Sequence, residues 1–210
     1  MKVAVTTSKD DDNLTATART IAGELDVAFI PREKRGLDTL RKDFGLDCLL
    51  VVEQNRLVLK GETELAWHPS MAVPRIKALR EGKSDHMVEA MGLETGYRVL
   101  DCTLGLGSDA LVAAYAVGPA GHVTGLEKNK FIAFLTRWGM KHFNGPNKHL
   151  LAALSRITVL NEDSLEYLGK QPSGSFDTVY FDPMFRRARE KSSAMNALRP
   201  FADHSPLTPE

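Results

Sequence analysis

The sequence predicts an α/β protein in which a small N-terminal α/β unit precedes a doubly wound, mostly parallel β-sheet. Two observations predict the sheet. From about residue 97 onwards, short apolar runs typical of buried strands alternate with segments of helical spacing, which favours parallel strands joined by right-handed helical crossovers. The first of these strands also leads directly into a glycine-rich turn and a helix, an arrangement typical of the ligand-binding edge of such a sheet.

The N-terminal part has its own order of elements. Apolar residues at helical spacing predict its first helix, with Asp12 as the capping residue, and Pro31 is expected to end the strand that follows. None of its residues indicates chemistry. The predicted elements are a strand over 2–6, a helix over 13–25, a strand over 27–30, a helix over 37–43, and strands over 48–52 and 57–60 joined by a hairpin across 53–56.

The second part begins near residue 67, after a boundary segment over 61–68. We therefore expect one domain over 1–66 and a second over 67–210. Four strands are few for a doubly wound sheet, so we expect the sheet to lack its C-terminal strands. The predicted elements are a helix over 74–92 with Gly82 as its weak point, strands over 97–102, 122–126, 157–160 and 178–181, and helices over 109–117 and 130–142.

The composition is that of a folded protein without overall charge. The 210 residues are 43% hydrophobic and 26% charged, which is enough apolar material for a packed core. Lys plus Arg and Asp plus Glu are both 27, so a nucleic-acid partner requires a local basic patch. Cys48 and Cys102 lie in apolar runs and are predicted to be buried free thiols. Without a signal-peptide core or a membrane span, the chain is expected to be cytoplasmic and to have no membrane partner.

The glycine-rich turn after the first strand of the second part is the centre of the predicted site. It runs from Asp101 through Gly105 and Gly107 into a helix, whose first N–H groups and positive dipole end suit a nucleotide. Asp101 fits a cofactor with a cationic amino-acid end, and Glu127, at the end of the next strand, fits ribose hydroxyls. A dinucleotide site, with Ala110 in place of a third glycine, and a plain structural turn are the alternatives. A phosphate loop is excluded because no Gly-Lys-Ser/Thr follows.

Two further strand ends carry candidate residues. Asp163 can accept from the exocyclic amine of adenine, or else cap a helix that begins at Ser164. Asp182 is followed by Pro183 and, two residues later, Phe185. A carboxylate, a rigid proline and an aromatic ring at a strand end suit a planar target amine, whose base stacks on the ring. An ordinary Asp-Pro loop is the alternative.

Basic residues follow this segment. They could contact RNA phosphates or form a solvated basic stretch. His68 could line a substrate entrance or be structural. No metal site is predicted, because the six His residues form no spaced set. The basic residues are Arg186, Arg187, Arg189 and Lys191.

Together these motifs resemble the ribosomal RNA small-subunit methyltransferase J family, a group of class I S-adenosylmethionine-dependent enzymes assigned to guanine N2 methylation in 16S ribosomal RNA. The matching pieces span about residues 67 to 191. Arg186 stands where the family tends to have proline, and the surroundings of Asp163 differ from the small, hydroxylic residues usual there, so a diverged branch is an alternative. The matches are Asp101-x-Thr103-x-Gly105-Leu106-Gly107-x-Asp109-Ala110, Leu126-Glu127-x-Asn129, Val179-Tyr180-x-Asp182-Pro183-Met184-Phe185 and Lys191-Ser192.

The resemblance implies a Rossmann-like fold, S-adenosylmethionine as cofactor and ribosomal RNA as partner. A non-catalytic or regulatory nucleotide-binding module, a methyltransferase with another substrate, and an NAD-dependent oxidoreductase are the competing hypotheses. The residues expected to act are Asp182, Pro183 and Phe185 in catalysis, Asp101, Thr103, Gly105, Gly107, Asp109, Glu127, Lys128, Asp163 and Ser164 in cofactor binding, and His68, Arg186, Arg187 and Lys191 in substrate binding.

Overall fold

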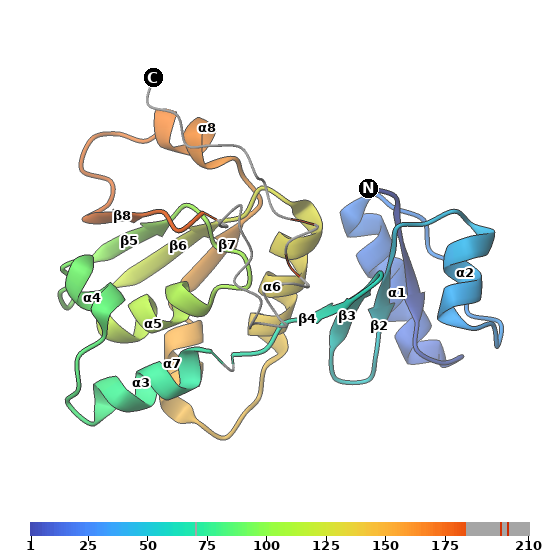
Figure 1. Ribbon diagram of the computed structural model, residues 1–210, viewed down its shortest axis with the longest axis horizontal. Coiled ribbons are helices and arrows are strands. Elements are labelled where there is room, and N and C mark those ends of the chain that lie inside the picture. The colour runs from blue at the N-terminus through green and yellow to red at the C-terminus, as the bar shows by residue number, and fades with distance from the viewer. Residues whose placement is uncertain (70, 184–197, 199–200, 202–210) are drawn as a thin grey trace. The chain divides into compact units, whose positions relative to one another are not determined.

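The computed structural model describes residues 1–69, 71–183, 198 and 201, and the chain divides into two compact units, the first ending at Trp67 (Figure 1). The predicted domain boundary lies one residue earlier. Each unit contains a four-stranded sheet. Within the described residues, none of the helices is both long and apolar enough to cross a membrane.

The sheet of the first unit has the order β1-β2-β3-β4. Its two inner strands and β1 are almost wholly buried, and helix α1 packs on β1. The pairing of β1 with β2 is parallel, and the other two pairings are antiparallel. The elements are β1 (Val3–Thr7), α1 (Asp12–Leu25), α2 (Leu37–Asp43), β2 (Cys48–Val52), β3 (Leu57–Lys60) and β4 (Glu64–Ala66).

Three details of this unit differ from the sequence prediction. Asp11 caps α1, not Asp12: the Asp11 side chain accepts from the Leu14 amide at 3.0 Å, and Asp12 is already helical. The predicted strand over 27–30 is reduced to a single bridge between Val5 and Phe29. Strand β4 lies inside the predicted boundary segment, where its three residues pair with β3.

The sheet of the second unit has the order β7-β6-β5-β8, with every pairing parallel. This confirms the predicted fold class. The chain moves outward from β5 to β7 and then returns to the other side of β5, so the direction of winding reverses next to β5. Ligands bind at such a reversal, outside the carboxyl ends of the strands. The strands are β5 (Arg98–Asp101), β6 (His122–Leu126), β7 (Ile157–Leu160) and β8 (Thr178–Tyr180).

Helices cover both faces of this sheet. Figure 1 shows α5 on one face and α8 on the other, and Leu100, Cys102 and Leu126 form the apolar cluster beneath α8. Both predicted free thiols, Cys48 and Cys102, are buried and unbridged. The connecting helices are α5 (Ser108–Ala116), α6 (Lys130–His142), α7 (Lys148–Leu154) and α8 (Ser164–Gly169).

The single helix predicted over 74–92 is wrong, because the chain forms two helices there, α3 (Ala72–Arg80) and α4 (His86–Ala90). Gly82 adopts a φ of 76°, which ends the first helix. The carboxylate of Asp85 then accepts from the Met87 and Val88 amides and starts the second. Helix α7, capped by Asn147, was not predicted.

Candidate active site

The parallel pairing of the second sheet brings the predicted strand ends together at one edge. Asp101, the last residue of β5, pairs in register with Gly125 of β6 and Tyr180 of β8. Glu127 and Asp182 follow these two strands within two residues. Asn161 directly follows β7, so the strand ends that carry Asp101, Glu127, Asn161 and Asp182 lie side by side, as expected for the predicted parallel sheet.

The glycine turn is fastened to the strands on both sides of β5. The Cys102 amide donates to the Tyr180 carbonyl at 2.9 Å, and the Leu104 amide donates to the Leu126 carbonyl at 3.0 Å. Gly107 has a φ of 71°, and a methyl group added to it would overlap the Met140 side chain. Only glycine fits this position without strain, so the turn approaches α6 closely and leaves the first amides of α5 at the edge.

Glu127 braces the same turn from the next strand. Its Oε2 accepts from the Gly105 amide at 3.1 Å, and its Oε1 accepts from the Asn129 amide at 2.8 Å. Burial raises the pKa of Glu127, and these two amide hydrogen bonds oppose the rise. The carboxylate is therefore fixed in place before any ligand arrives.

Asp101 is the most buried acid of the site, with 3% of its surface exposed. Desolvation raises its pKa to about 7, although the Thr103 amide donates to its carboxylate at 3.0 Å and opposes the rise. The nearby carboxylates of Asp109, Asp182 and Glu127 raise the pKa further, because like charges disfavour ionisation. Around neutral pH the Asp101 carboxyl can gain or lose its proton.

The sign of this charge limits the ligand that the edge can hold. Asp101, Asp109, Glu127 and Asp182 form an acidic cluster at the glycine turn. A dinucleotide would bring its negatively charged pyrophosphate close to these carboxylates. A ligand with a cationic end instead gains attraction from them and relieves their mutual repulsion. The cluster therefore fits the ammonium and sulfonium of S-adenosylmethionine better than it fits NAD.

Asp182 is joined to the glycine turn by its main chain. Its amide donates to the Thr103 hydroxyl oxygen at 2.8 Å, so one residue of the turn positions the start of the Asp-Pro segment. Desolvation and the Asp109 charge raise the pKa of the Asp182 carboxyl. Pro183 is exposed, like Asp182. The other predicted residues of this segment, Phe185, Arg186, Arg187, Arg189 and Lys191, lie outside the described residues.

Asp163 has the local role of a helix cap. Its Oδ1 accepts from the Leu165 and Glu166 amides at the start of α8, and its Oδ2 pairs with the Lys128 ammonium at 3.1 Å. The Glu166 amide and then the Lys128 ammonium hold the pKa of Asp163 below its usual value. Ser164 is the first residue of α8. These residues lie beside Glu127, and a contact with adenine stays a prediction.

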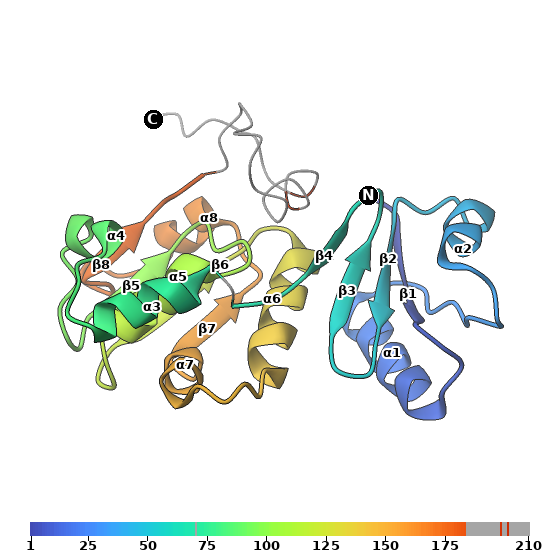
Figure 2. The same cartoon turned by 60° about the horizontal axis from the view of Figure 1, so that its bottom comes forward.

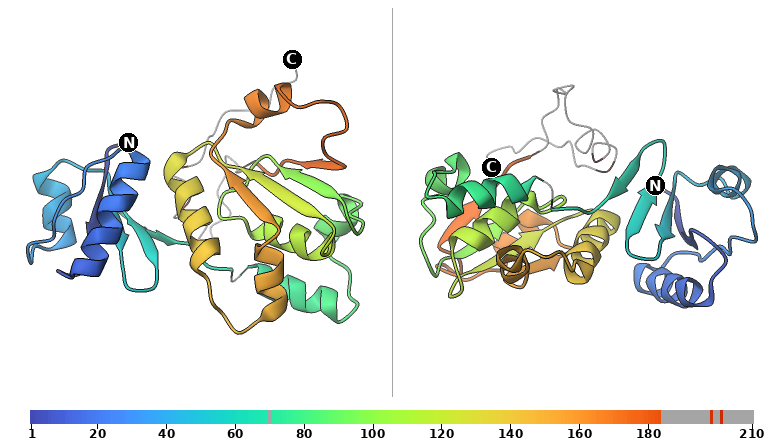
Figure 3. Two further views of the ribbon diagram at one scale, coloured as in Figure 1. Left: turned by 180° about the vertical axis from the view of Figure 1, so that it is seen from behind. Right: turned by 90° about the horizontal axis from the view of Figure 1, so that it is seen from below.

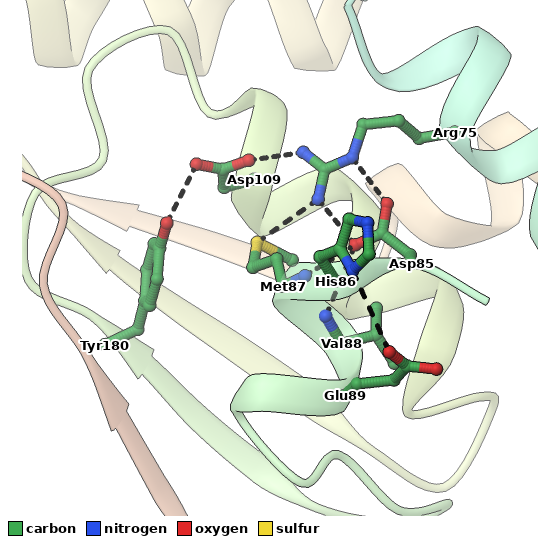
Figure 4. Close-up of polar contacts among 8 residues, drawn as sticks. All are labelled: Arg75, Asp85, His86, Met87, Val88, Glu89, Asp109 and Tyr180. Atoms are coloured by element: carbon green, nitrogen blue, oxygen red, sulfur yellow. Dashed lines mark hydrogen bonds and ion pairs between the residues drawn. The ribbon is translucent and has the colours of Figure 1, made fainter.

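A polar network that no sequence motif indicates holds Asp109 (Figure 4). Arg75 of α3 pairs with Asp109 Oδ1, and the Tyr180 hydroxyl donates to Asp109 Oδ2 at 3.1 Å. The same guanidinium donates to both oxygens of Asp85, at 2.7 and 2.8 Å. Both carboxylate oxygens of Asp109 thus have protein partners, and its predicted role in cofactor binding stays a prediction. No local spacing could reveal this network, because Arg75 lies 34 residues before Asp109.

One predicted residue, His68, has a less defined place. His68 is exposed at the start of the second unit, and its role as a substrate contact stays a prediction. The described residues contain no group of three or more His, Cys, Asp or Glu side chains that could hold a metal ion.

Comparison with known proteins identifies relatives over most of the chain. Residues 34–202 match the model of a family described as "Putative SAM-dependent methyltransferase". An uncharacterized protein of Bacillus subtilis, YpiP, is 38% identical over 205 residues, which is 97% of this chain and 80% of that protein. A structure titled as a putative rRNA-methylase from Clostridium thermocellum is 19% identical, with a TM-score of 0.37, and the match covers 56% of this chain and 59% of that one.

Enzymes named ribosomal RNA small subunit methyltransferase J are also similar. The one from Cellvibrio japonicus is 29% identical over 62% of this chain and 50% of its own length. The one from Marinobacter nauticus is 30% identical over 84% of this chain and 63% of its own length. The chain thus spans less than two thirds of the length of either enzyme.

Proposed function

The chain belongs to the SAM-dependent methyltransferase family whose model it matches, and from this premise we propose that it methylates an exocyclic base amine of RNA, namely guanine N2 in small-subunit ribosomal RNA. The observation that carries the proposal is the bond between the Asp182 amide and the Thr103 hydroxyl. It ties an acidic Asp-Pro segment to the turn on which the cofactor would lie. A carboxylate at that place suits a planar amine as methyl acceptor.

We assign the cofactor to the acidic edge described above. S-adenosylmethionine supplies a methyl group activated by a sulfonium. Asp101 would accept from its ammonium, Glu127 from its ribose hydroxyls, and Lys128 and the start of α8 would lie near its adenine. Asp109 would act through its negative charge, with its carboxylate held in place by Arg75 and Tyr180. The glycine turn would let the cofactor approach the backbone.

The catalytic task is to orient the acceptor. Asp182 would accept a hydrogen bond from the target amine and direct the nitrogen lone pair at the methyl group. Its raised pKa makes it a better acceptor for the proton that the amine releases after transfer. Pro183 would stiffen the segment and Phe185 would stack on the base. Arg186, Arg187 and Lys191 would contact phosphates next to that base, with His68 near the entrance.

The RNA substrate is tested by transfer of tritiated methyl groups to small-subunit ribosomal RNA that carries no modifications. We expect label in the RNA and, after nuclease digestion, in N2-methylguanosine. Label in another nucleotide would keep the enzyme class and reject guanine N2. Tight binding of S-adenosylmethionine without any labelled RNA would reject RNA as the substrate and favour a binding module or another acceptor.

The buried acid predicts a pH-dependent cofactor affinity. Free Asp101 titrates near pH 7, and its ionised form is the one that attracts an ammonium. The affinity for S-adenosylmethionine should therefore rise several-fold between pH 6 and pH 8, and binding near pH 7 should release protons. Calorimetry in buffers of different ionisation enthalpy measures that release.

The same acid affects the stability of the free protein. Its pKa is about 7 when folded and near 3.8 when unfolded, so the folded state holds the extra proton between these values. The free energy of unfolding should then fall as the pH rises from about 4 to 7. Asp101→Asn should remove this pH dependence and raise the melting temperature at pH 8. It should also weaken the binding of S-adenosylmethionine. An unchanged pH profile in Asp101→Asn would contradict the assignment.

A further inference from the structure

One stretch of the second unit contains only positive charges. Residues 128–161 contain six Lys or Arg residues and two His residues but no Asp or Glu. The whole chain has equal numbers of acidic and basic residues, so this stretch is a local exception. It forms α6, α7 and β7, which lie together at one edge of the second sheet (Figures 2 and 3).

Three of the cations lie along one line of α6. Lys130, Arg137 and Lys141 are separated by seven and four residues, and all three are exposed. With 3.6 residues per turn, these positions fall within about 40° of one another around the helix axis. At a rise of about 1.5 Å per residue, the line is roughly 17 Å long.

The positive surface continues on α7. Lys148 and His149 are exposed at its first turn, after a connection of five residues from the end of α6. A hollow of about 330 Å³ lies among α6, α7 and β7, with Arg137 and Lys141 in its lining beside apolar side chains such as Leu151. We call the surface of Lys130, Arg137, Lys141 and Lys148 the α6–α7 ridge.

An aromatic group lies on the same stretch. The half-buried Trp138 stacks on the ring of the exposed His142, with the centroids 4.1 Å apart and the planes 22° from parallel. Cations interleaved with aromatic rings and apolar side chains are typical of surfaces that bind single-stranded nucleic acid, where phosphates meet the charges and bases meet the apolar groups.

The ridge begins next to the site. Helix α6 starts one residue after Asn129, whose amide donates to Glu127, and it runs away from the carboxyl edge of the sheet. A nucleic acid that lies along the ridge therefore leads to the cofactor edge. We propose that the α6–α7 ridge binds the phosphates of the single-stranded RNA next to the target base. The inference rests on the RNA substrate proposed above.

The test is RNA binding by a triple variant, Arg137→Gln, Lys141→Gln and Lys148→Gln. Each lost phosphate contact lowers the salt dependence of binding by about 0.7 in the logarithmic slope. We expect the dissociation constant for a single-stranded ribosomal RNA fragment to rise at least tenfold and the slope to fall by about 2. The affinity for S-adenosylmethionine should not change. Methyl transfer should be slower because the KM for RNA rises, with kcat near that of the wild type.

The control removes as much charge from other helices of the same unit. Lys77→Gln, Arg80→Gln and Lys170→Gln change exposed cations on α3 and next to α8. We expect this variant to bind RNA like the wild type. A second variant of the ridge, Lys148→Glu alone, guards against misfolding of the triple variant and should weaken binding in the same direction.

The outcomes separate the two proposals. If the wild type binds RNA through the ridge but methylates none, the substrate assignment fails and the ridge stands. If the wild type methylates RNA while the ridge variants keep its RNA affinity and salt slope, or the control loses as much, the ridge is rejected. Absence of RNA binding by the wild type at low salt rejects it too. The ridge is also rejected if its variants keep their affinity for RNA and lose only binding to phosphatidylglycerol vesicles, because that result would indicate a lipid surface.

Discussion

Asp182→Ala should reduce the rate of methyl transfer by about 10²–10⁴-fold, which is the range for loss of a positioned acid or base. The affinity for S-adenosylmethionine should stay near that of the wild type. The reason lies in the site. Asp182 joins the glycine turn through its amide, which the substitution keeps, and among the described residues no hydrogen bond or ion pair of its carboxylate competes with the acceptor. Turnover and cofactor affinity, measured together by rapid quench and calorimetry, check this expectation.

Glu127→Ala should act mainly on cofactor affinity, and should weaken binding of S-adenosylmethionine far more than Asp182→Ala does. Two charge-assisted hydrogen bonds to ribose are worth about 1.5–3 kcal/mol each before water compensates, so the dissociation constant should rise at least tenfold. The substitution also removes the acceptor of the Gly105 and Asn129 amides, which frees the turn. Glu127→Gln keeps one acceptor oxygen, so its dissociation constant for S-adenosylmethionine should lie between those of the wild type and Glu127→Ala.

A structural role for Asp182 predicts a different result. Both Asp182→Ala and Asp182→Asn would then lower the melting temperature, with near-normal activity per folded molecule. In the catalytic case Asp182→Asn should keep partial activity, because an amide oxygen still accepts one hydrogen bond. Asp177→Asn is the matched control, since Asp177 precedes the same strand at its other end, where it accepts from Arg98. Equal effects of the Asp177 and Asp182 variants on turnover would contradict the catalytic role.

Much of the second unit could be predicted because its signals are local. Strands β6 and β7 and helix α6 have the predicted bounds, since each is an apolar or periodic run with polar residues at its ends. Alternation of strands and helices then implies a parallel sheet, and a parallel sheet brings the residues after its strands to one edge. Asp101, Glu127 and Asp182 could be placed together for that reason.

The errors occur where local signals are ambiguous. Three consecutive aspartates, Asp10 to Asp12, could each cap α1, and only the backbone angles select Asp11. Gly82 is a weak point of the predicted helix, but a glycine is tolerated inside many helices, so the break could not be inferred from it. Asp163 fits both a helix cap and an adenine contact by sequence; the structure shows the cap, and the adenine contact stays a prediction.

Contacts between distant segments are the part that the sequence could not supply. The Thr103 hydroxyl meets the Asp182 amide across 79 residues, and Arg75 meets Asp109 across 34. Neither pair has a spacing that a helix or strand would impose. The fold determines both contacts. Each of them positions a residue, Asp182 or Asp109, that the sequence did indicate.

Arg75 should therefore matter more than any sequence motif suggests. Arg75→Met removes the counter-charge of Asp85, whose side chain is 10% exposed, and of Asp109, which is 32% exposed. Exposed ion pairs contribute about 0–1 kcal/mol and breaking a buried pair costs about 3–5 kcal/mol, so this half-buried pair of contacts should cost about 2–3 kcal/mol. The second unit should melt roughly 5–10 °C lower, as followed by scanning calorimetry.

The loss should depend on pH in a defined direction. The bond to Arg75 is the largest cause that holds the pKa of Asp85 below 3.8, so the stabilisation is present above about pH 4 and is lost as the pH falls through the folded pKa. The difference between wild type and Arg75→Met should shrink below pH 4. Lys77→Met, which breaks the exposed pair with Glu81 on the same helix, should change the melting temperature by much less.

If Arg75 were purely structural, its substitution would change stability alone. The charge network predicts a second effect, on the pH dependence of cofactor binding. Asp109 lies close enough to raise the pKa of Asp101, and in the wild type the Arg75 guanidinium offsets the Asp109 charge. Without Arg75, the pH midpoint of S-adenosylmethionine binding should move above that of the wild type. Arg75→Lys keeps the charge without the two-pronged bond to Asp85, so it should restore the midpoint while leaving part of the stability loss. A midpoint that is the same in all three proteins would restrict Arg75 to holding α3, α4 and α5 together.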